Sequence, residues 1–364
     1  MAHPGSRRDT GEPTRRSRLR RRLAVVLMIG GFGLMAWLIT HFNSSAIVAA
    51  LRAAGARGLL AICGFHLIVV VLMGFAWWNL LRLGKPQIFV WGRLVRDAGS
   101  EVLPLSQIGG YILGARAAVL QGVRGTAAAA SMVVDATVEF CAQIAFVGVG
   151  LALLLSHWPN STLALPVMVG LVAAGAAVGT FIAIQRTGPD MPLRGVARLL
   201  RNRAGALFSA AASVRLEIRR IHGSNLRLGL SFLLHFCAWM ASGMEAWVAL
   251  RLMGVSLSPV VVLTIESLLY ATRSLTFLVP ASLGVQEGAY VVLGSALGLT
   301  PDVALALSLL KRGRDLALGV PALVSWQLFE THAQRRIQTA PPSELEVQRS
   351  ALAQESGCSS IRPM

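Results

Sequence analysis

Residues 127–155 read AAAASMVVDATVEFCAQIAFVGVGLALLL, and the only charged side chains in this run are Asp135 and Glu139. A helix of about 20 residues spans the roughly 30 Å hydrocarbon core of a bilayer. This run is therefore long and apolar enough to form a transmembrane helix. Other long apolar stretches predict further spans at 23–42, 58–81, 162–184, 226–253 and 301–330.

The composition agrees with a membrane protein. Hydrophobic residues make up 54% of the chain and charged residues 14%, whereas a soluble domain carries about 25% charged residues. A net charge of +17 would suggest nucleic acid as the partner of a soluble protein. Here the basic residues gather at 1–22 and 186–227, between the apolar runs, as they do in cytoplasmic loops. We therefore expect a cytoplasmic N-terminus and no nucleic-acid partner.

The chain divides into three parts. We expect a basic cytoplasmic segment at 1–22, a membrane domain at 23–329 and a disordered polar tail at 330–364. Within the loop at 186–227, apolar residues recur at spacings of three, four and seven, which is typical of an amphipathic helix. Its basic face predicts a position on the anionic cytoplasmic leaflet, and a plain solvated connector is the alternative. Residues 44–56 predict a short interfacial helix.

Two segments interrupt the apolar pattern. Residues 101–116 read EVLPLSQIGGYILGAR, and residues 278–290 read LVPASLGVQEGAY. Both contain Pro-x-Ser, then Gln and Gly within a few residues, then Tyr. Proline removes a backbone donor and glycine relaxes helical preference, so the helix should unwind at both places. The residues expected to shape the two breaks are Pro104, Ser106, Gln107, Gly109, Gly110, Pro280, Ser282, Gly284, Gln286 and Gly288.

Paired broken segments of this kind have a functional meaning in membrane proteins. Unwound backbone at membrane depth is tolerated only where protein buries it or water reaches it. Paired interruptions in two halves of a chain indicate the binding site of a transporter. The sequence therefore predicts an all-α polytopic membrane protein with about six full spans, two re-entrant helical segments and an inverted repeat. The alternative is coincidence, because small residues and proline are common in membrane helices.

Charged side chains inside the expected membrane segments are the second signal. A charge at the bilayer centre costs about 3 kcal/mol on insertion scales, so these residues must pair or line a hydrated cavity. Asp135 and Glu139 share one helix face and need a cation, for which Arg116 is the nearest candidate along the chain. The expected substrate-binding set is Arg116, Asp135, Glu139, Arg273, Glu287, Lys311, Arg312 and Arg314.

These charges allow two interpretations. In the first, the cations contact a polar or anionic lipid headgroup, while the acids hold them in place or accept a coupling proton. In the second, the charges form ion pairs that only fix helix packing. The sequence has no His-Glu-x-x-His motif and no Gly-x4-Gly-Lys-Ser/Thr motif, and its histidines are isolated and expected to be packed or at the surface. We therefore expect no catalytic residues, no metal and no cofactor.

The motifs also resemble those of a known family. Pro104-x-Ser106-Gln107-x-Gly109-Gly110, Asp135-x3-Glu139 with Arg116, Pro280-x-Ser282-x-Gly284-x-Gln286-Glu287-Gly288 and Arg312-x-Arg314-Asp315 look like the transmembrane (flippase) domain of the lysylphosphatidylglycerol synthase/flippase family. The similarity covers about residues 23–329. The stretch from Val279 to Gln327 looks most like the branch found in bacterial hopanoid-biosynthesis gene clusters.

The resemblance implies a multi-pass protein of the bacterial inner membrane that moves lipids between leaflets. The lipid it implies is a hopanoid or an anionic or aminoacylated lipid. Bifunctional members of the family add an aminoacyl-transfer domain after the membrane domain, and only residues 331–364 follow the last expected span here, so we expect no enzyme. The alternative is an accessory subunit that associates with lipid-biosynthesis enzymes, such as those of the hopanoid pathway, and transports nothing.

Overall fold

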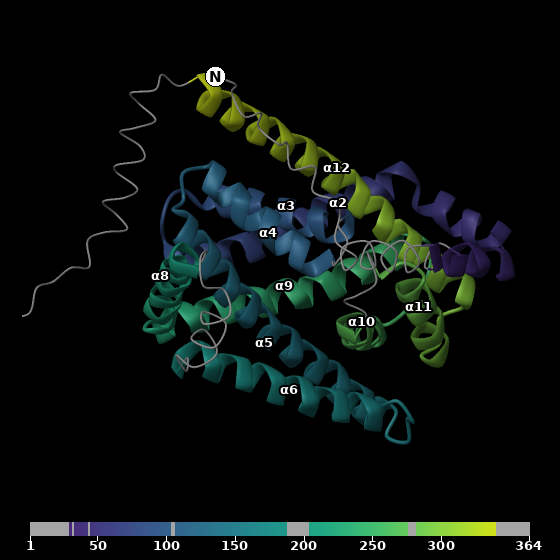
Figure 1. Cartoon of the computed structure of the whole chain (residues 1–364). Helices are drawn as coiled ribbons and strands as arrows, with labels where there is room; N and C mark the ends of the chain where they lie inside the picture. Colours follow the sequence, from purple (N-terminus) through teal and green to yellow (C-terminus); the bar gives the residue numbers. More distant parts are fainter. Residues whose placement is uncertain are drawn as a thin grey trace, which may run out of the picture.

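The computed structural model describes residues 29–30, 33–42, 44–102, 106–187, 204–275 and 282–339, and its regular elements within these ranges are all helices (Figure 1). Four of them are long and apolar enough to cross a bilayer. The chain is therefore an all-α polytopic membrane protein, as the apolar pattern predicts. Those four helices are α2 (Ser44–Leu81), α5 (Gly125–His157), α6 (Ala164–Thr187) and α9 (Asn225–Leu252).

These helices coincide with the spans predicted at 58–81, 127–155, 162–184 and 226–253. The expected interfacial helix at 44–56 is the first part of α2, and a kink at Gly55 joins it to the span. Gly55 has φ +57° and ψ −167°, a conformation that only glycine adopts without strain. The span predicted at 23–42 lies partly outside the described residues, although 33–41 are helical.

The last helix is longer than expected. Helix α12 (Pro301–Thr339) begins where the sequence predicts, but it continues past residue 330. The expectation of a disordered tail from 330 is therefore wrong as far as Thr339, and residues 340–364 lie outside the described part of the chain. In Figure 1, α12 is the long helix that crosses the bundle beside α2, α3 and α11.

Each broken segment consists of two short helices. The first pair is α3 (Pro86–Val102) with α4 (Ser106–Leu120), and the second is α10 (Pro259–Leu275) with α11 (Val285–Ala296). The helix is thus interrupted at both predicted places. Pro104 and Pro280 lie outside the described residues, and the inverted repeat stays a prediction.

Glycine allows α2 and α3 to approach closely. A Cβ atom added at Gly74 would lie 2.5 Å from the Cα of Val90 and 2.9 Å from its backbone nitrogen. Nearby, the rings of Trp77 and Phe89 pack edge to face with centroids 5.0 Å apart. Small residues at helix contacts are the usual means of close packing in membranes. This contact fixes α3, which carries much of the charged cluster described below.

The loop at 186–227 contains α8 (Ala204–His222), so its helical pattern is confirmed within the described residues. Its apolar residues Val214, Ile218 and Ile221 pack against side chains of α2 and α5, which include Leu80 and Val134. The apolar face of this helix is therefore covered by protein at these residues, and the position of its basic face on the cytoplasmic leaflet stays a prediction. The first half of the loop, from 188 to 203, is outside the described residues.

The close contact of α2 with α3 gives a first prediction. Gly74→Ala should lower the unfolding free energy by about 1–3 kcal/mol, because the new methyl group meets backbone atoms that cannot rotate away. Gly64→Ala on the same helix is the matched control, since a Cβ atom added at Gly64 has no neighbour within 4 Å. Thermal unfolding in detergent measures both variants, and equal midpoints would contradict the packing described here.

A second prediction concerns the end of α8. His222 contacts Gln185 through Nε2 at 2.9 Å, and its buried Nδ1 has no hydrogen-bond partner among the described residues. Burial, together with the nearby Arg186, lowers the pKa of His222 below 6.5. The neutral ring therefore favours docking of α8 above pH 6.5, and this contribution is lost as the pH falls through the lowered pKa.

Amide hydrogen exchange of α8 measures this effect. Protection should fall several-fold on acidification in the wild type. In His222→Gln, which has no titrating group at this position, it should change much less. The same pH dependence in both proteins would rule out His222 as its cause.

Candidate functional site

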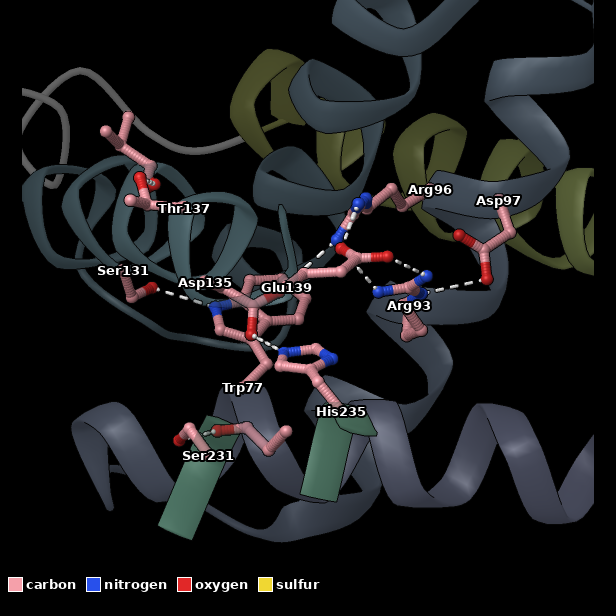
Figure 2. Close-up of polar contacts among 12 residues, drawn as sticks. Trp77, Arg93, Arg96, Asp97, Ser131, Asp135, Thr137, Glu139, Ser231 and His235 are labelled. Atoms are coloured by element: carbon pink, nitrogen blue, oxygen red, sulfur yellow. Dashed lines mark hydrogen bonds and ion pairs between the residues drawn. The ribbon is translucent and has the colours of Figure 1, made fainter. Parts of the chain in front are cut away.

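A cluster of buried charges joins α3 to α5 (Figure 2). Arg93 donates two hydrogen bonds to the carboxylate of Glu139, at 3.0 and 2.8 Å, and a third to Asp97 at 2.9 Å. Arg96 donates to Glu139 at 2.5 Å and to Asp135 at 3.2 Å. The acids of α5 are therefore neutralised by two arginines of α3.

Helical spacing explains why these residues meet. Arg93, Arg96 and Asp97 are three and four positions apart and share one face of α3, and Asp135 and Glu139 share one face of α5. When these faces oppose each other, the planar guanidinium groups match the two oxygens of a carboxylate. The result is a network in which each acid contacts at least one cation.

Helices α9 and α4 complete this cluster. The Nε2 atom of His235 lies 3.0 Å from the Oδ1 atom of Asp135, and both side chains are fully buried. The ring of Tyr111 lies under the guanidinium of Arg96, with 4.1 Å between the guanidinium carbon and the ring centroid. In Figure 2, a dashed line joins His235 to Asp135, and dashed lines join Arg93 and Arg96 to Glu139. Four helices thus meet at one ionised centre.

A second cluster surrounds the start of α11. Glu287 caps this helix, because its carboxylate accepts a hydrogen bond from the backbone N–H of Gly284 at 2.8 Å. The same carboxylate accepts one from Nε of Arg312 at 2.6 Å. Glu266 of α10 accepts hydrogen bonds from Lys311 at 2.7 Å and from the hydroxyl of Tyr290 at 2.6 Å. These contacts fix α10 and α11 against α12.

Arg314 of α12 is the centre of a third group of ion pairs. It pairs with Glu245 of α9 and with the neighbouring Asp315, whose Oδ1 atom lies 2.6 Å from Nη2. The other oxygen of Glu245 is 2.8 Å from Nδ1 of His66 on α2. Glu245 of α9 therefore contacts side chains of both α2 and α12.

A cavity of about 390 Å³ lies between these groups. Its charged lining comes from the first cluster, from the ion pairs around Arg314 and from Glu101, and it consists of His66, Arg93, Arg96, Asp97, Glu101, Glu139, Arg314 and Asp315. The side chains of Arg93, Arg96 and Arg314 are only 4–6% exposed, whereas those of Asp97, Glu101 and Asp315 are 22–35% exposed. Carboxylates, and not guanidinium groups, are therefore the charges that a molecule in this cavity would meet first.

The structure places the predicted site residues in three different ways. Glu139 and Arg314 line the cavity, and Asp135 lies directly behind it. Lys311, Arg312 and Glu287 belong to the adjoining network. Arg116 was expected to neutralise the acids of α5, and this expectation is wrong: Arg116 pairs with Glu330 at 2.8 Å and is 41% exposed, on the outer side of α4.

The residues of the two broken motifs differ in the contacts that they make. Gly110 is required by packing, because a Cβ atom there would overlap Ser100 and the carbonyl of Arg96. Gln286 donates to Ser308 at 3.2 Å, and Ser282 is buried. Gly109 lies in α4. A Cβ atom added at Gly288 would have no neighbour within 4 Å, so packing does not require glycine there. The side chains that lie outside the described residues are those of Pro104, Ser106, Gln107, Arg273 and Pro280.

Sequence reasoning missed the residues of α3 and both histidines. A repeated spacing could have found the former: Arg93-x-x-Arg96-Asp97 has the same pattern as Lys311-x-x-Arg314-Asp315. Both motifs lie on helices that adjoin a broken segment, and both contribute to the cavity lining. The histidines carry no comparable signal, because their carboxylate partners are distant in sequence.

The charged side chains of this site compensate one another and offer hydrogen-bonding groups to the cavity. In the part of the chain that is described, no group of three or more His, Cys, Asp and Glu side chains is arranged to hold a metal ion. The carboxylates can accept hydrogen bonds, the guanidinium groups can donate them and exchange ion-pair partners, and an imidazole can carry a proton.

A third prediction tests the central role of Glu139. Glu139→Gln should lower the unfolding free energy by about 3–5 kcal/mol, because Arg93 and Arg96 then remain buried without their shared counter-charge. Asp97→Asn is the matched control, since it removes another carboxylate partner of Arg93, one that solvent reaches. It should lower the unfolding free energy by less than about 1 kcal/mol. Unfolding in detergent measures both variants. Equal losses of unfolding free energy in the two variants would contradict this network.

Comparison with known proteins agrees with a membrane domain. A family model described as the lysylphosphatidylglycerol synthase TM region matches residues 22–322. This range contains α2 to α11 and the part of α12 that carries the buried charges. No curated protein and no solved structure matches the chain. Since the match extends over most of its length, the chain belongs to the family of the lysylphosphatidylglycerol synthase TM region.

Proposed function

We propose that this protein binds a membrane lipid and moves its headgroup between the leaflets of the bacterial inner membrane. The observation that carries the proposal is the cavity of about 390 Å³ between the helices, whose lining includes seven charged side chains and His66. Its volume is within the range of about 300–1,000 Å³ that is common for small-molecule sites. Family membership supports a role related to membrane lipids. In this proposal the N-terminus is cytoplasmic and the lipid leaves chemically unchanged.

The charges favour one class of headgroup. Each guanidinium that lines the cavity already donates to a carboxylate, so an anionic headgroup would have to displace that carboxylate. Asp97, Glu101 and Asp315 are more exposed and can accept further hydrogen bonds. Of the lipids considered from the sequence, an aminoacylated or otherwise amine-bearing lipid therefore fits better than an anionic one. A hopanoid would need an amine or several hydroxyl groups to use these acceptors.

A second candidate function is a membrane subunit that associates with lipid-biosynthesis enzymes, such as those of the hopanoid pathway, and transports nothing. The completeness of the ion pairing favours it, because paired charges can serve only to fix helix packing. The two candidates differ in what the exposed carboxylates do. A transporter needs them, whereas a scaffold tolerates their neutralisation.

Transfer in reconstituted vesicles provides the test. The double variant Asp97→Asn with Asp315→Asn keeps the shape of both side chains and removes two accessible charges. Transfer of a phosphatidylethanolamine with a fluorophore on its acyl chain should fall at least tenfold, and transfer of the equivalent phosphatidylglycerol should fall less. The readout is the fraction of fluorophore that dithionite quenches from outside over time.

The control variant is Arg116→Ala, which removes a charge of the membrane domain that does not line the cavity and should transfer lipid like the wild type. If the wild type moves neither lipid, the transport proposal is wrong. If the double variant moves both lipids at the wild-type rate, the assignment of the cavity is wrong. The scaffold function predicts instead no transfer by the wild type and unchanged co-purification of partner enzymes with the double variant.

A further inference from the structure

An apolar groove lies next to the charged cavity, between α2 and α3. It has a volume of about 480 Å³, and its lining includes Leu67, Val71 and Phe75 from α2 and Trp91 and Leu94 from α3. The three side chains of α2 are exposed. A surface of this kind is stable in the hydrocarbon of a bilayer, where it contacts lipid chains.

A small pocket, called the passage below, lies between the groove and the cavity and shares lining residues with both. The passage has a volume of about 50 Å³ and shares Val70 and Leu94 with the groove. It shares His66, Asp97 and Asp315 with the cavity. The lining therefore changes from hydrocarbon to carboxylate and imidazole over a few residues of α2 and α3. This order of surfaces matches the two ends of a single amphiphile.

We propose that the groove between α2 and α3 is the lateral entry site of the lipid. An acyl chain lies in the groove against Val71 and Phe75, and the headgroup passes between His66 and Asp97 into the cavity. This inference rests on the proposed function, because it takes the cavity as the headgroup site. It adds the side of the bundle from which the lipid enters and the helices that bind its apolar part.

The groove suits an acyl chain better than a partner protein. A protein helix docked between α2 and α3 would cover the apolar side chains but would leave the passage and its carboxylates unused. An acyl chain leaves the groove at Val70 and Leu94, where the passage begins. Charge complementarity supports the same occupant, since a headgroup amine that leaves the membrane surface meets Asp97 and Asp315 at once.

Photo-crosslinking of the full-length protein in vesicles tests the groove as a binding site. The vesicles contain phosphatidylethanolamine and phosphatidylglycerol, with a trace of phosphatidylethanolamine that has a diazirine on its acyl chain. Mass spectrometry should find label on Leu67, Val71 and Phe75 at least five times more often than on Val169 and Val172. The latter residues are at least as exposed, on α6, and only bulk lipid should reach them. If the amount of label on each residue depended only on its exposure, the proposal would be overturned.

Two substitutions test the groove as a route. Val71→Trp should fill it at an exposed position that tolerates a larger side chain, and Leu94→Trp should obstruct the passage. Both should reduce label in the groove and slow lipid transfer at least tenfold. Ile68→Trp is the matched control, because Ile68 is exposed on the same part of α2 and does not line the groove. Wild-type transfer by Val71→Trp would overturn the route.

The outcomes separate this inference from the proposed function. Enriched label in the groove without any transfer by the wild type would support a lipid-binding groove and contradict the transport function. Transfer by the wild type with label spread evenly over exposed residues would contradict the groove and leave the transport function supported.

Discussion

The structure depends on the neutralisation of charge inside an apolar bundle. Breaking a buried ion pair costs about 3–5 kcal/mol, because the remaining charge has neither water nor a partner. Asp135 and Glu139 of α5 therefore require Arg93 and Arg96, and this requirement keeps α3 within reach of α5. The apolar surfaces of the helices cannot specify this arrangement alone, since lipid tails solvate them as well as another helix does. Ion pairs and small residues choose the partners.

The same constraint applies on the opposite side of the cavity. There α12 supplies Lys311, Arg312 and Arg314, and their carboxylate partners come from helices α9, α10 and α11. A broken helix helps in each case, because a short helix can turn its charged face inward without carrying charge across the whole bilayer. Glu287 lies at such a break. Its carboxylate caps α11 and also accepts a hydrogen bond from Arg312.

Much of the fold could be predicted, and the partners in the site could not. The spans at 127–155, 162–184 and 226–253 follow from length and apolarity, which are local properties. The breaks follow from proline and glycine, which act on their own backbone. Ion-pair partners depend on which helices become neighbours, so choosing Arg116 by its distance along the chain was an error. The apolar face of the loop helix was likewise ambiguous, since the same pattern can pack against lipid or against α5.

The division of the charges into buried and accessible sets has a consequence for transport. The arginines of the cavity are held by Glu139 and Glu245, which are themselves buried, so a ligand that removed those acids would expose uncompensated charge. Asp97 and Asp315 each contact an arginine that keeps another carboxylate partner. Either can therefore turn toward a headgroup amine while its arginine remains paired. In the proposed transport function, a polar group would thus bind and leave without breaking the pairs that fix the fold.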